Sequence, residues 1–428
     1  MCVGRRNPTR ANSRCPPGAL LGYPDAAVTD PAKPTILCIA SFFKGNRFLA
    51  RCKQDGWNVV LMTAESLMHE PWARESIDEI FAMPTFTDRK AVLNAVAYLA
   101  RTREFHRISP LDDYDVELVA LLREHIRVPG MGETTARYFR DKLAMRARAF
   151  DRGIKVPPFV HVLNHDKVRR FLAEVPGPWV LKPRAEASSS GIKKLSNPDD
   201  VWKAIEEFGD TQSNYLIEKM IPGDVYHVDG IISERNLVFA EVHKYRKPML
   251  ELVQQGGIFC TRTIPRDSDD ARALRTFNQE VMAQFGLMRG VCHSEYIKGR
   301  DDGAFYFLET SARVGGASIA DLVEATTGIN LWEEWARIET TQGESPYTLP
   351  PVRADYGGLI VSLARQEHPD TSAYVDPEIV WRLDKKNHVG FVVRAGTPER
   401  VLELIDALMP RIQTDFQATL PQPLKPTA

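Results

Sequence analysis

Short apolar runs alternate with helically spaced apolar residues between residues 35 and 130, and this alternation limits the possible fold more than any other feature. The runs Ile36–Ala40 and Val59–Met62 are continuous rather than alternating. Such runs are typical of strands buried on both faces of a parallel sheet. Helical spacing follows over 92–99 and 118–126. The segment therefore predicts an α/β layer domain.

The rest of the chain predicts α+β structure. Its 428 residues suggest about three domains. The first 34 residues hold six prolines and no periodic apolar pattern, so we expect a disordered leader. Beyond residue 130, strands such as Trp179–Pro183 and two hairpins, 225–242 and 291–310, mix with helices. The expected division is leader 1–34, N-terminal domain 35–130, central domain 131–350, C-terminal subdomain 351–416 and tail 417–428.

Composition narrows the class of protein without naming its chemistry. The 55 Lys and Arg residues nearly cancel the 56 Asp and Glu residues, which gives no overall drive toward nucleic acid or an anionic membrane. No apolar run approaches the roughly 18 residues of a membrane span. The six cysteines form no CxxC pair, so we expect neither disulfides nor zinc, and a cytoplasmic location.

The second hairpin carries the strongest chemical signal. Alternation places His293 and Glu295 on one strand face, and Glu309 with Ser311 on one face of the partner strand. An antiparallel pairing can bring Glu295 and Glu309 together. Two adjacent carboxylates repel each other unless a cation lies between them, and oxygen ligands favour Mg²⁺ or Mn²⁺. The alternative is that both glutamates are solvated strand ends.

Two lysines suggest a phosphate site. Lys182 ends an apolar strand just before a small-residue loop, Ser188–Gly191. Small residues let backbone N–H groups approach phosphate oxygens, and a lysine adds a point charge. The Walker A spacing is absent. Lys142 lies near the start of a predicted helix, and without further evidence we would interpret it as an ordinary exposed lysine.

Five short motifs in order resemble the ATP-grasp superfamily. The resemblance covers about residues 35 to 415 and is nearest to the biotin carboxylase-like and carboxylate–amine ligase branches. It implies a three-part architecture with a Rossmann-like N-terminal domain, an ATP-grasp domain and a small C-terminal segment. The motifs are Asp141–Arg146, Val180–Pro183, Glu218–Gly223, His293–Tyr296 and Glu309–Arg313.

The resemblance implies an ATP site. Lys142 and Lys182 would contact the α- and β-phosphates, and a lid would fold over the phosphates. The hinge strand with Lys219 would read the adenine edge through backbone groups of Glu218 and Ile221. The lid residues would be Ser188, Ser189, Ser190 and Gly191.

The resemblance also implies a transfer site. Glu295 and Glu309 would hold two Mg²⁺ or Mn²⁺ ions, and Arg313 with Lys182 would be catalytic, Arg313 steadying an acyl phosphate. Ser311 stands where the family usually has asparagine, so the second ion would be more weakly held.

The ribose contact departs from the family's usual pattern, and the substrate contacts rest on single residues. Val225 stands where the family often has an acidic ribose ligand, and Asp224 is a substitute only if the strand has not begun there. Arg246, in a basic run, is a candidate for the substrate carboxylate, with a solvated charged face as the alternative. Further candidate substrate residues are His293, Gly315 and Gly316.

The implied activity is ATP-dependent joining of a carboxylate to an amine through an acyl phosphate, with release of ADP and phosphate. The partners are then small molecules, without nucleic acid or membrane, and a homodimer is compatible with the resemblance. Two alternatives remain open. One is a biotin carboxylase-like enzyme that uses bicarbonate, although no carrier segment is recognisable. The other is an ATP-binding pseudoenzyme or sensor, suggested by Ser311 and Val225.

Overall fold

The structure is a computed structural model in which the strands of the described residues form three sheets. No helix in the described part of the chain combines the length and the apolar character that a bilayer crossing requires. The described residues are 33–186, 191–248, 250, 252, 257–341 and 346–418.

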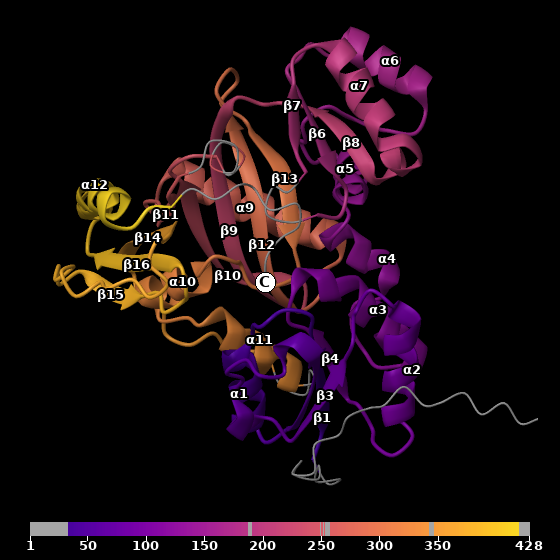
Figure 1. Cartoon of the computed structure of the whole chain (residues 1–428), viewed down its shortest axis with the longest axis vertical. Helices are drawn as coiled ribbons and strands as arrows, with labels where there is room; N and C mark the ends of the chain where they lie inside the picture. The colour runs from indigo at the N-terminus through magenta and orange to yellow at the C-terminus, as the bar shows by residue number, and fades with distance from the viewer. Residues whose placement is uncertain are drawn as a thin grey trace, which may run out of the picture.

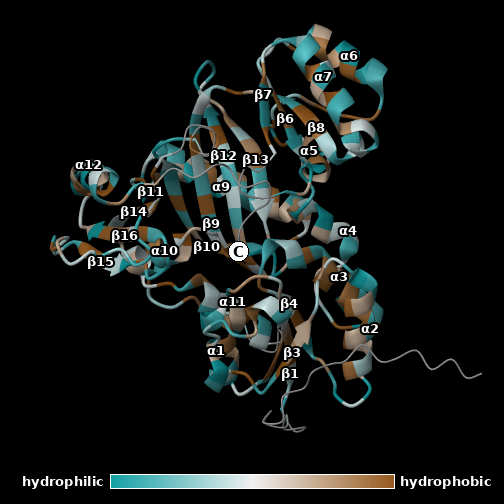
Figure 2. Ribbon diagram, viewed as in Figure 1, coloured by the Kyte–Doolittle hydropathy of each residue, from teal (hydrophilic) through white to brown (hydrophobic). Residues whose placement is uncertain are grey.

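The N-terminal part is the predicted α/β layer domain, with a parallel sheet in the order β3-β2-β1-β4 (Figure 1). Every residue of β1 is buried, which accounts for its continuous apolar run. In Figure 2, α2 and α3 carry both hydrophobic and hydrophilic residues, as helices covering a sheet do. The strands are β1 (Thr35–Ala40), β2 (Asn58–Ala64), β3 (Glu79–Met83) and β4 (Arg107–Pro110), and the helices are α1 (Asn46–Gln54), α2 (Arg89–Leu99) and α3 (Val116–Ile126).

A small antiparallel sheet in the order β5-β8-β6-β7 follows and carries α6 and α7, at the top right of Figure 1. The sequence pattern does not predict β5 and β7, which have three residues each. The strands are β5 (Phe159–His161), β6 (Trp179–Pro183), β7 (Lys193–Leu195) and β8 (Tyr215–Lys219). The helices of this region are α4 (Glu133–Ala136), α5 (Lys142–Asp151), α6 (His165–Glu174) and α7 (Pro198–Phe208).

The largest sheet is antiparallel, in the order β13-β12-β9-β10-β11-β14-β16-β15. The pairing of β11 with β14 joins the expected C-terminal subdomain to the central part in one continuous sheet. The strands are β9 (Gly223–Ser233), β10 (Asn236–Tyr245), β11 (Phe259–Thr263), β12 (Gly290–Gly299), β13 (Phe305–Ser311), β14 (Tyr356–Leu363), β15 (Ile379–Arg382) and β16 (His388–Ala395). The helices are α9 (Asp269–Phe285), α10 (Ile319–Thr327), α11 (Leu331–Thr340) and α12 (Pro398–Asp415).

Candidate active site

A cavity of about 410 Å³ lies between the small sheet and the β12–β13 hairpin. Its volume is within the usual range of small-molecule sites, roughly 300–1,000 Å³. It gathers residues from α5, β6, β8, β12 and β13. The sequence-predicted residues that line it are Lys142, Lys182, Glu218, Lys219, Ile221, Glu295 and Glu309.

The two hairpin glutamates are directly paired across β12 and β13, as alternation predicts. The hydroxyl of Tyr245 donates a hydrogen bond of 2.8 Å to Glu295 Oε1. Lys142 Nζ lies 3.0 Å from Glu309 Oε2. Burial opposes the charged form of Glu309, but Lys142 and Lys182 outweigh it and lower the pKa of Glu309 to about 2. Glu309 is therefore an anion at neutral pH.

Helix capping places Lys142 at this site. The side chain of Asp141 accepts hydrogen bonds from the backbone N–H groups of Leu143 and Ala144, which starts α5 at Lys142. The Lys142 ammonium also donates to the carbonyl oxygen of Glu186 at 2.7 Å. A lysine that appears ordinary in the sequence is thus buried beside a carboxylate.

A second buried cluster surrounds Lys182. Its ammonium lies 2.5 Å from Glu218 Oε1, and the guanidinium of Arg146 donates to Glu218 Oε2 at 2.9 Å. Burial lowers the pKa of Lys182 to about 8, although Glu218 acts against this shift. Burial likewise disfavours the Glu218 carboxylate, but Arg146 and Lys182 lower its pKa overall. The Glu218 side chain has a structural role that the sequence does not reveal.

The segment after β8 has backbone groups available to a ligand. The N–H of Met220 donates to the carbonyl of Pro178 at 2.9 Å, which holds this segment against the small sheet. Ile221 makes no such backbone bond with a described residue. Residues Ser188, Ser189 and Ser190 of the predicted lid lie outside the described residues, and Gly191 follows them with a φ of 69°.

The predicted catalytic residue Arg313 lies beyond the end of β13, outside the lining of this cavity. Its Nε is 3.6 Å from Oδ1 of Asp113, and its Nη1 donates to the carbonyl of Val314 at 2.9 Å. Asp113 also pairs with Arg140 at 3.1 Å. Sequence reasoning missed Asp113, although carboxylates directly after a parallel strand are candidate site residues.

The assignment of Asp224 to the ribose is not supported. β9 begins at Gly223, so Asp224 already lies within the strand and faces away from Val225. Val225 lines the cavity, whereas Asp224 forms an ion pair of 2.6 Å with Lys244 on the exposed surface. The condition on which the assignment depended is therefore not met.

The structure also does not bring Arg246 to the cavity. Its guanidinium pairs with Asp406 of α12 at 2.6 Å, with both side chains largely exposed. Gly315 does make a close approach, but to side chains of this chain. A Cβ there would lie 2.7 Å from Asp229 Oδ1 and 3.0 Å from His293 Nδ1, whereas one at Gly316 would meet nothing within 4 Å.

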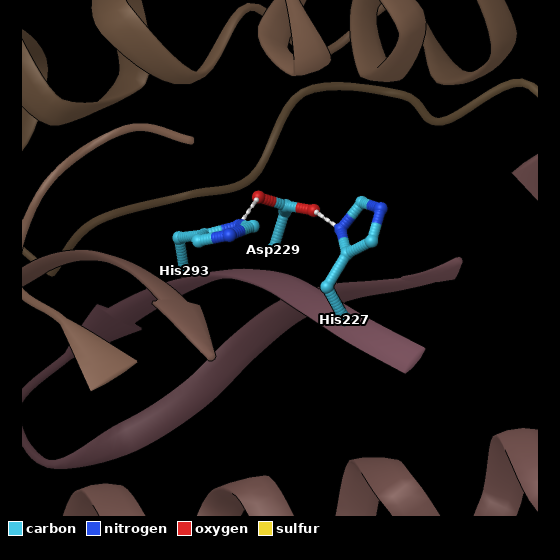
Figure 3. Close-up of side chains that lie close together, drawn as sticks. All are labelled: His227, Asp229 and His293. Atoms are coloured by element: carbon cyan, nitrogen blue, oxygen red, sulfur yellow. Dashed lines mark hydrogen bonds and ion pairs between the residues drawn. The ribbon is translucent and has the colours of Figure 1, made fainter. Parts of the chain in front are cut away.

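Asp229 is the centre of a buried histidine network that Figure 3 shows. Its Oδ1 accepts a 2.9 Å hydrogen bond from His293 Nδ1, and its Oδ2 a 2.7 Å bond from His227 Nδ1. Burial lowers the pKa of His227 to about 3. Burial also opposes protonation of His293, but Asp229 raises its pKa to about 9. His293 Nε2 lies 3.8 Å from Glu295, so the network reaches the candidate site.

The ligand atoms of this network lie within 4.8 Å of one another, close enough to consider a metal ion. Each carboxylate oxygen, however, already accepts a hydrogen bond from an imidazole (Figure 3), and Oδ2 also lies 3.3 Å from His243 Nδ1. An ion would have to replace both hydrogen bonds. The arrangement is that of a hydrogen-bond network that supports β12.

Known proteins resemble this chain in sequence and in fold. Residues 175–321 match the model of the ATP-grasp domain family. The L-arginine-specific L-amino acid ligase of Bacillus subtilis is 21% identical over 308 residues, which cover 70% of this chain and 72% of that protein. A D-alanine–D-alanine ligase of Thermotoga sp. is 23% identical over 239 residues, covering 50% of this chain and 74% of the relative.

Solved structures share the fold over most of this chain. The L-amino acid ligase from Bacillus licheniformis superposes with a TM-score of 0.70 at 15% identity, covering 90% of this chain and 98% of that one. The carboxyaminoimidazole ribonucleotide synthase from Aspergillus clavatus, solved with ATP, also gives 0.70, at 14% identity over 90% and 99% of the two chains. Such identities establish the fold alone. Together with the family match over 175–321, they show that the chain has an ATP-grasp fold and carries an ATP-grasp domain.

Proposed function

We propose that this protein is an ATP-dependent ligase that joins a carboxylate to an amine through an acyl phosphate. The observation that carries the proposal is the pairing of Glu295 with Glu309 at a cavity that also holds Lys142 and Lys182. Phosphoryl transfer depends mainly on positioning and charge neutralisation, and this set of side chains can supply both.

The residues fit divalent cations. Glu295 and Glu309 are neighbours on adjacent strands, Glu309 is ionised, and both offer the oxygen ligands that Mg²⁺ or Mn²⁺ prefers. Bound ions would neutralise charge on the transferring phosphoryl group. We propose that Glu295 and Glu309 would hold two such ions, with Ser311 as a weaker ligand.

We assign the nucleotide to the cavity between the small sheet and the hairpin. Lys182 and Lys142 would neutralise phosphate oxygens, each by leaving part of its present contact with Glu218 or Glu309. The backbone groups of Ile221, which bond to no described residue, suit the hydrogen-bonding edge of adenine. Residues Ser188–Gly191 would cover the phosphates and exclude water, which would otherwise hydrolyse an acyl phosphate.

The proposed reaction has two displacements. A substrate carboxylate oxygen forms a bond to the γ-phosphorus of ATP, and the bond to the ADP oxygen breaks. An amine nitrogen then attacks the acyl carbon, inorganic phosphate leaves, and the nitrogen loses a proton as the amide forms. Arg313 would stabilise the acyl phosphate once its contact with Asp113 is relaxed. Because relatives include L-amino acid and D-alanine ligases, we propose amino acids as substrates.

The three-part division of the chain, a cytoplasmic location and a homodimer also remain proposals. The continuous pairing of β11 with β14 argues that the C-terminal segment works as one body with the central sheet. Size-exclusion chromatography with light scattering would give the oligomeric state directly.

The Glu309→Gln variant tests the proposed function. The purified protein is incubated with Mg-ATP and pooled amino acids and acids, and ADP, phosphate and new amide masses are measured. We expect ADP formation to fall by about 100-fold or more, because the amide cannot hold a cation as the carboxylate does. The control is Glu367→Gln, an exposed glutamate paired with Lys386.

Three results would redirect the assignment. Wild-type turnover in Glu309→Gln would contradict the cation site. Turnover that depends on bicarbonate would favour the carboxylase alternative. ATP binding by the wild type without turnover on any pool would favour a sensor.

A further inference from the structure

A second cavity, of about 360 Å³, lies between the N-terminal domain and the base of the large sheet. It shares no lining residue with the proposed nucleotide cavity. Its walls come from β4, α3, the segment 129–132, the segment 286–291 and α11. Figure 1 shows β4 and α11 near each other below the large sheet.

The charges in this cavity are unbalanced. Arg107 and Arg123 both face Glu339. The side chain of Arg107 is 11% exposed, that of Arg123 is 8% exposed and that of Glu339 is 14% exposed. The nearest guanidinium nitrogen of each arginine is 4.0 Å from a Glu339 oxygen, which is beyond hydrogen-bond length. Two buried cations therefore share one loosely placed anion.

Arg123 also has hydrogen-bond donors that no described residue uses. Arg123 donates from Nε to the carbonyl of Ile108 at 2.8 Å, and Arg107 from Nη1 to the carbonyl of His106 at 2.8 Å. Among the described residues, neither terminal nitrogen of Arg123 has a hydrogen-bond partner. Glu339 is instead held by Trp335, whose Nε1 donates to Oε1 at 3.2 Å. A buried guanidinium with unused donors gains stability from a second anion.

The remaining walls are apolar. Trp335 and Ile338 lie one helical turn apart on α11 and face the cavity beside Glu339. The opposite walls include Pro110, Met131, Leu287 and Val291. Gly130, at φ 147°, keeps one wall open, since a Cβ there would lie 2.7 Å from Arg123 Nε. An inorganic anion would leave these apolar surfaces uncovered.

We propose that this cavity binds a small organic carboxylate with an apolar body, separately from the nucleotide. The carboxylate would lie between the guanidinium groups of Arg107 and Arg123, and the apolar body would pack on Trp335. The third arginine of the lining, Arg289, is engaged with Glu234 at the rim. The proposal does not depend on the ligase activity, because none of its residues belongs to the proposed active site.

The test uses 4-fluorophenylacetate as the probe, observed by ¹⁹F NMR with the full chain. We expect saturable binding that Mg-ATP does not displace. Arg107→Gln should weaken binding by about tenfold or more, because a charged hydrogen bond is lost. Glu339→Gln should tighten binding by about tenfold, because the amide no longer competes for the two arginines. Arg101→Gln, at an exposed arginine, is the control.

If the three charged residues had a purely structural role, Glu339→Gln would bring no gain in affinity for the probe. Unchanged or weaker binding in that variant would overturn the proposal, as would displacement of the probe by Mg-ATP or the absence of saturable binding. If Glu339→Gln does not fold, Arg107→Gln with a circular dichroism check decides, and unchanged affinity there would overturn the proposal.

Discussion

Replacing Lys182 with methionine should separate nucleotide affinity from stability. Lys182 is buried 2.5 Å from Glu218, so its removal resembles the breaking of a buried ion pair. Glu218, however, keeps the guanidinium of Arg146, whose Nε donates to it at 2.9 Å. The carboxylate therefore stays compensated after the substitution.

The expected loss of folding stability depends on how many buried charges each substitution leaves without a partner. Breaking a buried pair costs about 3–5 kcal/mol when an uncompensated charge remains. Lys182→Met leaves none, and it removes a lysine whose pKa burial lowers to about 8, so we expect a stability change within about 1 kcal/mol. Glu218→Gln leaves two buried cations and should cost the full 3–5 kcal/mol or so. A lost charged hydrogen bond of about 1.5–3 kcal/mol should weaken ATP binding in Lys182→Met by roughly 10- to 140-fold.

Urea denaturation measures the stability of both variants, and isothermal titration calorimetry measures Mg-ATP affinity of Lys182→Met. The control is Lys203→Met, at an exposed lysine of α7 that should change neither quantity. Wild-type ATP affinity in Lys182→Met would refute the phosphate assignment. A loss of about 3 kcal/mol in Lys182→Met would refute the idea that Arg146 alone compensates Glu218.

Two further predictions concern Glu309 and Gly315. The folded-state pKa of Glu309 is about 2, below its ordinary value of 4.5, so its ion pair with Lys142 stabilises the fold above pH 4.5 and is lost as the pH falls toward 2. Urea denaturation between pH 5 and 3 should therefore show a smaller decline in Glu309→Gln than in the wild type, and parallel declines would contradict the shift. Gly315→Ala should lower the melting temperature and turnover, because its Cβ would lie 2.7 Å from Asp229 Oδ1. Gly316→Ala, with open space around its Cβ, should behave as wild type, and equal effects of both changes would argue against packing as the cause.

Much of the fold follows from local pattern. The buried run at β1 predicts a parallel strand, and the period of two predicts that Glu295 and Glu309 share a hairpin face, which the pairing of β12 with β13 confirms. The short strands β5, β7 and β15 escape prediction, because three or four residues carry too little periodicity.

The errors have physical causes. Asp224 was a candidate ribose contact only if β9 started later, and strand boundaries depend on hydrogen bonds to a neighbouring strand rather than on local sequence. Arg246 lies in a basic run, but whether its guanidinium faces a cleft or α12 depends on where that helix packs. Asp113 was missed because the strand before it, β4, has only four residues.

The sequence by itself determines the longer strands and helices, the ionisable side chains available and the side chains that share a face within such an element, because these depend on residues close in the chain. Only the tertiary structure decides which charges meet. Lys142, Lys182 and Glu309 come from separate elements, and their pKa values and contacts exist only after burial removes water between them. The same holds for Arg107, Arg123 and Glu339, whose unbalanced charges arise because β4, α3 and α11 pack together around a cavity.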